Sequence, residues 1–162
     1  MAKYFLRPVC EKDYADIAAV YNSNPVFLQN HLGLERVDAA FAAEEAACMR
    51  KAGFCSCAIV NAESAKIQGI LDYRSGQEAY LSLIMIDARL QGRGIGRSIY
   101  FNFEQQMRQA GSMSIRIDVV NDYPGSLVSY WKALGFSEAE TISLRWGKKT
   151  SRAMLMRKRI QQ

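Results

Sequence analysis

The sequence predicts an α/β (α+β) fold in one domain over residues 1–162, with a single mixed, mostly antiparallel sheet of about seven strands and about four flanking helices. Three observations predict this fold. Apolar residues alternate with period two through the middle of the chain. A glycine-rich turn then leads into an amphipathic helix, and no repeat, low-complexity tract or linker divides the sequence. At 162 residues, 49% of them hydrophobic, the chain can bury a sizeable core.

The N-terminal third predicts one strand and two helices. Residues 4–9 are expected to form a short strand, and Asp13 is placed to cap a helix that continues to Tyr21. Residues 22–25, Asn-Ser-Asn-Pro, have the composition of a turn and end this helix. A second helix is expected over residues 38–53.

The remainder alternates between strands and helices. Three strands with short polar turns imply an antiparallel meander, and they are expected at 54–60, 66–73 and 79–87. A helix, a strand, a helix and two closing strands follow, and they are expected at 95–110, 114–120, 126–134, 136–146 and 151–159. The strand–helix–strand order around the first of these helices predicts a parallel pair with a right-handed crossover.

The most informative stretch is residues 91–96, Gln-Gly-Arg-Gly-Ile-Gly, between a predicted strand and a predicted helix. Glycines let a ligand approach the backbone closely, and the unpaired N–H groups of a first helical turn point at a bound anion. This arrangement fits a phosphate or pyrophosphate. A Rossmann loop is the main rival, because Asp118 follows at a suitable distance, but that fold needs several parallel crossovers and only one fits here. A Walker A loop is excluded because no Gly-Lys-Ser/Thr is present.

The composition favours a protein of the reducing cytoplasm without membrane or nucleic-acid partners. No apolar run approaches the roughly 18 residues of a membrane span, and the N-terminus lacks the apolar core of a signal peptide. Much of the formal net charge of +5 lies in residues 148–159, which indicates a solvated closing hairpin. Cys55 and Cys57 are expected to be reduced and buried on one face of a strand. Because His31 is the only histidine, no metal site is predicted.

Two motifs resemble those of the GNAT superfamily of acyl-CoA N-acyltransferases, the GCN5-related N-acetyltransferases. The family signature Gln/Arg-x-x-Gly-x-Gly/Ala is matched by Gln91, Gly94 and Gly96. Residues 130–136, Tyr-Trp-Lys-Ala-Leu-Gly-Phe, resemble the family's aromatic pair before a Gly-Phe dipeptide. The order of the expected elements matches the family over nearly the whole chain.

The resemblance implies an enzyme that moves an acetyl or longer acyl group from acetyl-CoA directly to the primary amine of a small molecule or peptide. It also implies that the strands carrying residues 84–86 and 115–120 separate and open a slot for the pantetheine arm. The residues implied for cofactor binding are Ile84, Met85, Ile86, Gln91, Gly92, Arg93, Gly94, Ile95, Gly96, Arg97 and Asn121. A homodimer is compatible with the family, and no metal ion is implied.

The catalytic groups depart from the family pattern. The position of the family's carboxylate base corresponds to about Tyr80, and a phenol is a poor base near neutral pH. Glu78, on the same strand face, and Asp72, on the neighbouring strand, are therefore the candidate bases. Trp131 occupies the place of the family's acidic tyrosine, which leaves Tyr130 as the candidate acid. Because a thiol has a pKa of about 8.5, losing its proton donor costs at most roughly 2 kcal/mol.

Two hypotheses follow from this departure. The first is an active N-acetyltransferase, and the second is a catalytically silent CoA-binding or interaction module. In the family, residues 21–34, which include Phe27 and His31, would form one wall of the acceptor site, and His31 is a candidate contact there. The sequence leaves open which amine is accepted and whether the acyl group is acetyl or longer.

Overall fold

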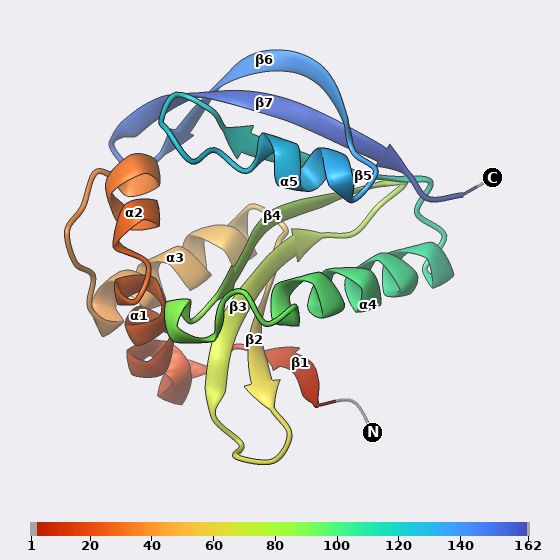
Figure 1. Cartoon of the computed structure of the whole chain (residues 1–162). Coiled ribbons are helices and arrows are strands. Elements are labelled where there is room, and N and C mark those ends of the chain that lie inside the picture. Colours follow the sequence, from red (N-terminus) through yellow and green to blue (C-terminus); the bar gives the residue numbers. More distant parts are fainter. Residues whose placement is uncertain (1–2, 162) are drawn as a thin grey trace.

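A computed structural model of the protein, which describes residues 3–161, contains one seven-stranded mixed sheet with strand order β1-β2-β3-β4-β5-β7-β6 (Figure 1). The strands are β1 (Tyr4–Pro8), β2 (Cys55–Asn61), β3 (Ile67–Arg74), β4 (Glu78–Ile86), β5 (Ser114–Val120), β6 (Ser137–Trp146) and β7 (Lys149–Arg159). The helices are α1 (Tyr14–Asn22), α2 (Pro25–Phe27), α3 (Ala39–Lys51), α4 (Ile95–Gln109) and α5 (Val128–Ala133). The predicted fold class is confirmed.

The strand pairing follows the predicted pattern and adds one feature. Strands β1 to β4 form the antiparallel meander, and β4 pairs with β5 in parallel after the helical connection through α4. The last strand, β7, inserts between β5 and β6, so that β6 lies at the edge of the sheet. None of the described helices is long and apolar enough to cross a membrane.

The two faces of the sheet carry separate hydrophobic clusters. Helices α1, α2 and α3 cover one face, where Tyr21, Leu83 and Met85 are buried together. Helix α4 covers the other face, where Phe103 and Trp131 are buried with residues of β4 and β5 (Figure 1). Each face of the central strand β4 therefore belongs to a different cluster.

Two local predictions were wrong and one was confirmed. Asp38, at the start of the second predicted helix, caps α3, because its carboxylate accepts from the N–H of Phe41 at 2.9 Å. Asp13 precedes α1 but caps no N–H of that helix; its carboxylate accepts from the Arg7 guanidinium at 2.7 Å instead. This ion pair holds the pKa of Asp13 well below its usual range. Cys57 is buried as expected, whereas Cys55 is exposed because it lies at the start of its strand.

A bulge bends β4 at the point where it leaves β5. Asp72 of β3 pairs with Leu83, but Tyr73 pairs with Leu81, so Ser82 is an extra residue on β4. The parallel pairing with β5 extends only to the pair of Tyr80 with Arg116. Beyond that pair the two strands diverge, as the family resemblance implies.

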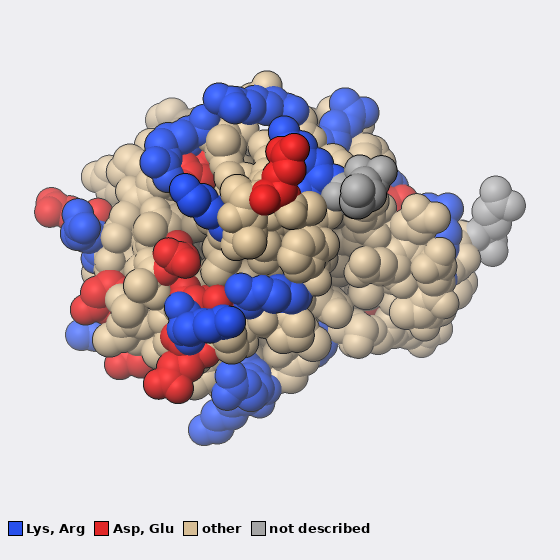
Figure 2. Space-filling view, turned by 90° about the horizontal axis from the view of Figure 1, so that it is seen from below, with Lys and Arg blue, Asp and Glu red and all other residues tan. Residues whose placement is uncertain are grey.

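Charged side chains of both signs occur on the face of the molecule shown in Figure 2. Basic side chains follow the upper rim of that face, acidic and basic side chains are interspersed on the left of the view, and much of the right is uncharged. This distribution agrees with a solvated surface and gives no support to a nucleic-acid site on that face.

Gly69 of β3 lies opposite Ile86 and allows β3 and β4 to lie close together at the end of β4. A Cβ at this residue would lie 2.5 Å from the Met85 carbonyl oxygen and 2.9 Å from Cδ1 of Ile59. We therefore expect Gly69→Ala to lower the free energy of unfolding by about 2 kcal/mol, measured by urea denaturation, because the backbone must move. An unstrained Gly→Ala change usually stabilises by reducing the entropy of the unfolded chain, so a more stable variant would contradict the expectation.

Candidate functional site

A cleft of about 920 Å³ opens where β4 and β5 diverge. Both strands line it, together with the glycine-rich loop at residues 91–96, the α2 region, α5 and the end of β6. The cleft therefore joins the α4 side of the sheet to the side covered by α1, α2 and α3. It brings together most of the residues predicted for the site.

The glycine-rich loop presents free N–H groups to open space. Gly92 and Gly94 have φ angles of 77° and 78°, a conformation that favours glycine, and Gly94 is the N-cap of α4. A Cβ at either glycine would meet nothing within 4 Å. Within the described part of the chain, no backbone N–H from residue 92 to residue 97 donates to a protein acceptor. The loop and the positive end of the α4 dipole therefore form an available anion site.

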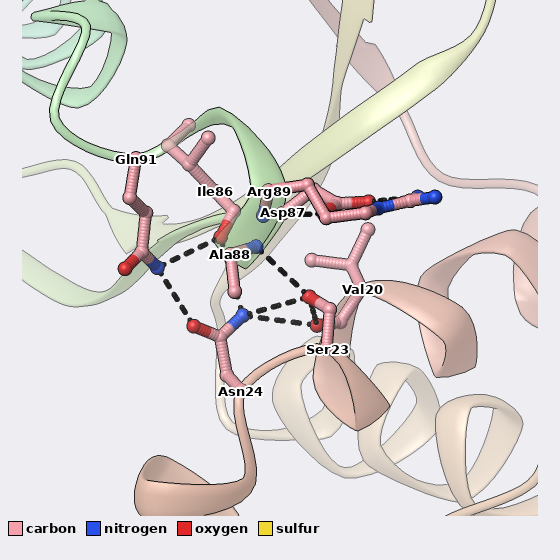
Figure 3. A network of polar contacts seen from close by, with 8 residues as sticks. All are labelled: Val20, Ser23, Asn24, Ile86, Asp87, Ala88, Arg89 and Gln91. Atoms are coloured by element: carbon pink, nitrogen blue, oxygen red, sulfur yellow. Dashed lines mark hydrogen bonds and ion pairs between the residues drawn. The ribbon is translucent and has the colours of Figure 1, made fainter.

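The start of this loop is held by a network of polar contacts to α1 (Figure 3). The Gln91 side chain donates to the Asn24 side-chain oxygen at 2.7 Å and to the Ile86 carbonyl at 3.2 Å. The Asn24 amide also donates to the Ile86 carbonyl at 3.2 Å, and the Ala88 N–H donates to the Ser23 hydroxyl at 3.0 Å. Gln91 of the signature thus braces the loop from within the protein. Asn24 was not predicted as a site residue, because in the sequence it is recognisable only as part of the turn at residues 22–25.

Strand β4 leaves unpaired backbone groups along the cleft. The N–H of Asp87 donates to the Gln68 carbonyl of the neighbouring chain segment at 2.9 Å. Because antiparallel pairs alternate between bonded and non-bonded positions, the backbone groups of Ile84 and Ile86 face away from β3 and those of Met85 face toward it. Of the three predicted contacts, Ile84 and Ile86 therefore offer backbone groups to the cleft.

The two candidate bases lie outside the cleft. Glu78 is exposed at the start of β4, where its carboxylate accepts from the Arg157 guanidinium at 2.8 Å. Asp72 is 2% exposed and faces a small enclosure beneath α1 and α3 beside Glu45 and Ser56. Burial raises the pKa of Asp72 to about 7, and one of its oxygens has no hydrogen-bond partner in the described residues.

Asp118 lines the cleft, and both of its carboxylate oxygens accept hydrogen bonds within the protein. It accepts from the Tyr80 hydroxyl at 2.6 Å and from two nitrogens of the Arg116 guanidinium at 3.0 and 2.9 Å. Burial and this hydrogen bond raise the pKa of Tyr80 far above its usual value. The Tyr80 phenol therefore keeps its proton near neutral pH, and both oxygens of Asp118 already accept hydrogen bonds. Sequence reasoning weighed Asp118 only as a mark of a Rossmann fold, and spacing alone could not reveal its partners.

Both aromatic residues of α5 line the cleft, but they differ in exposure. Tyr130 is 41% exposed, whereas Trp131 is largely buried and packs against Tyr100 and Phe136. Asn121 does not line the cleft, because its side chain accepts from Arg152 at 3.3 Å. The structure thus brings Tyr130 to the predicted site and leaves Asn121 outside it.

Aromatic side chains form the wall of the cleft beyond the strands. Phe27 and His31 are stacked with their ring centres 4.2 Å apart. The rings of Tyr123 and Trp146 are steeply inclined to the His31 ring, at 72° and 88°, and their centres lie 5.7 and 6.4 Å from its centre. Burial lowers the pKa of His31 to about 4, so its ring is neutral near pH 7. Phe27 and His31 lie where the resemblance implied an acceptor wall; Tyr123 and Trp146 were not anticipated.

Comparison with known proteins identifies the family. The family model described as acetyltransferase (GNAT) domain matches residues 31–159, most of the chain. The chain therefore belongs to the GNAT acetyltransferase family, and the predicted resemblance is confirmed. No curated protein sequence matches it.

Solved structures share the fold at low sequence identity. An acetyltransferase from Thermus thermophilus is 20% identical with a TM-score of 0.76, covering 98% of this chain and 97% of that chain. The structure of yncA from Salmonella typhimurium with its cofactor acetyl-CoA is 14% identical with a TM-score of 0.66, covering 99% and 95%. A chimera of Vibrio cholerae spermidine N-acetyltransferase SpeG with hSSAT is 14% identical with a TM-score of 0.69, covering 98% and 96%.

The raised pKa of Asp72 makes the stability of the protein depend on pH. The folded state keeps a proton that the unfolded chain releases near pH 4, so the free energy of unfolding falls as the pH rises toward 7 and then levels off. Urea denaturation at pH 5 and pH 8 should show that wild type loses about 2 kcal/mol more than Asp72→Asn across this range. Glu78→Gln is the matched control at an exposed carboxylate. A difference between wild type and Asp72→Asn that is the same at both pH values would contradict the expectation.

Proposed function

We propose that this GNAT acetyltransferase transfers an acetyl group from acetyl-CoA directly to a primary amine, and that residues 1–162 form one N-acetyltransferase domain. One observation carries the proposal: the row of unbonded N–H groups at residues 92–97, which opens onto a cleft between two separated strands. The acetyl-CoA present in yncA from Salmonella typhimurium, which shares the fold, supports the choice of cofactor.

The N–H groups of the glycine-rich loop would hold the diphosphate of the coenzyme. Gly92 and Gly94 allow close approach, and the exposed Arg93 and Arg97 add positive charge beside the N-terminus of α4. The unpaired backbone groups of Ile84 and Ile86 would bind the amides of the pantetheine arm as a partner strand does. Gln91 would act by holding the loop in place, whereas Met85 and Asn121 would contribute little.

The chemistry that remains requires few side chains. The Ile86 carbonyl is already bonded to Asn24 and Gln91, whereas its N–H faces the cleft and would donate to the oxygen that becomes negative during attack. Tyr130 would donate a proton to the departing thiolate, since it lines the cleft. Because neither Glu78 nor Asp72 lines the cleft, the amine would enter the reaction as its neutral form, in equilibrium with solvent. Catalysis would then come mainly from positioning.

A catalytically silent CoA-binding module is the second candidate function. It is favoured by the absence of a free carboxylate among the described residues that line the cleft and by Trp131 at the place of the family's acid. Both functions need the same anion site, so cofactor binding alone does not separate them.

Turnover separates the two candidate functions. We expect the enzyme to release free thiol from acetyl-CoA when a panel of primary amines is added, and to release it faster at higher pH because more of each amine is neutral. Thiol release is followed with a chromogenic thiol reagent and the acetylated amine by mass spectrometry. Binding of acetyl-CoA by calorimetry without product from any amine would support the silent module and overturn the enzyme.

Gly94 provides the test of the anion site. Gly94→Leu should abolish measurable acetyl-CoA binding in calorimetry, because its side chain enters the open space that the proposal gives to the diphosphate. Gly111→Leu is the matched control, since Gly111 follows the other end of α4 with a φ angle of 92° and an open Cβ position but does not line the cleft. Both variants carry similar backbone strain, so only the first should lose the ligand. Wild-type affinity in Gly94→Leu would remove the basis of the proposed site.

A further inference from the structure

The far wall of the cleft is an aromatic cluster assembled from distant parts of the chain. Its members are Phe27 of α2, His31 of the following turn, Tyr123 after β5, and Trp146 at the end of β6. Phe27 stacks on His31. The Trp146 ring is nearly perpendicular to the Phe27 ring, and the two ring centres are 5.5 Å apart. The indole N–H of Trp146 donates to Glu45 of α3 at 3.0 Å, which fixes the plane of that ring.

This cluster lies on the opposite side of the sheet from the glycine-rich loop. Phe27 and Trp146 pack on the cluster beneath α1 and α3, whereas the residues of α4 pack on the other face. The gap between β4 and β5 connects the two sides through one continuous cleft. A coenzyme arm that follows β4 from the loop would therefore present its thioester toward the aromatic cluster.

The charges around the cleft disfavour an acceptor with several ammonium groups. Asp118 is the one acidic residue among the described residues that line it, and both of its oxygens are bonded to Arg116 or Tyr80. The charged side chain next to Trp146 on the lining is Arg145, which is positive. The His31 ring is neutral near pH 7. A second ammonium would thus find no unbonded carboxylate among the described residues that line the cleft. Glu45 and Asp122 lie just outside this lining, where Glu45 accepts from the Trp146 indole and Asp122 accepts from the Arg152 N–H.

We propose that the acceptor is an aromatic monoamine, that is, a primary amine on a flat aromatic body with no second positive charge. The inference rests on the proposed function and names the acceptor of that same site. The rings of Phe27, His31, Tyr123 and Trp146 offer faces and edges for stacked and edge-on contacts with such a body. These contacts would leave the amine at the gap between the strands.

The proposed acetyl transfer is balanced in bonds and protons. The amine nitrogen forms a bond to the acetyl carbonyl carbon, and the bond from that carbon to sulfur breaks. The amine loses one proton as the amide forms, and the thiolate gains one to become the free thiol of coenzyme A. The reaction requires no oxidant, reductant or metal ion.

The experiment compares three amines with the wild-type enzyme at saturating acetyl-CoA. They are 2-phenylethylamine, n-hexylamine (apolar but not aromatic) and spermidine. We expect kcat/KM for 2-phenylethylamine to exceed that for n-hexylamine by about tenfold and that for spermidine by more. Equal or faster acetylation of spermidine would overturn the inference while leaving the proposed function intact. Acetyl-CoA binding without acetylation of any of the three would also overturn it, and failure to bind acetyl-CoA would remove the proposed function instead.

A pair of variants tests the aromatic cluster directly. Phe27→Leu keeps an apolar side chain but removes the ring, so KM for 2-phenylethylamine should rise about tenfold while acetyl-CoA affinity by calorimetry stays unchanged. Phe5→Leu is the matched control, because Phe5 is exposed on β1 and does not line the cleft. Equal KM values in the two variants, both folded by circular dichroism, would overturn the role of the cluster.

Discussion

The candidate site depends on one structural constraint, the separation of β4 from β5 after three parallel pairs. The extra residue Ser82 bends β4 at this point, and the strands beyond it share no ladder. Unpaired backbone groups inside a sheet are costly unless another partner satisfies them. The Ile86 carbonyl finds such partners in Asn24 and Gln91, whereas the N–H groups facing the cleft remain available to a ligand.

The Asn24 network connects the two ends of the cleft. Asn24 lies at the junction of α1 and α2, immediately before the segment that carries Phe27 and His31. Its side chain contacts both the end of β4 and Gln91, the first residue of the glycine-rich loop. The aromatic wall and the anion site are therefore braced by one small set of hydrogen bonds, which positions them relative to each other.

Among the residues that the structure describes, the cleft is lined by no carboxylate that lacks hydrogen-bond partners. Asp118 is held by Arg116 and Tyr80, and Asp72 is buried on the far side of β3 beneath α1 and α3. A site of this kind is suited to holding two reactants in contact rather than to strong acid–base chemistry. An aromatic wall agrees with that arrangement, since it would hold the body of an acceptor by ring packing rather than by ion pairing.

The sequence by itself determined the class of fold, most element boundaries within a few residues, and the glycine-rich loop, because periodicity and turn chemistry are local properties. It also determined the family, through Gln91, Gly94 and Gly96 and the residues around Tyr130. Only the tertiary structure decided that β7 rather than β6 pairs with β5 and that Asp13 binds Arg7 instead of capping α1. It also decided that Asp72 turns away from the cleft, that Asp118 is engaged, and that Tyr123 and Trp146 join His31. These outcomes depend on which segments come into contact across the sheet, and they cannot be predicted from the spacing of residues along the chain.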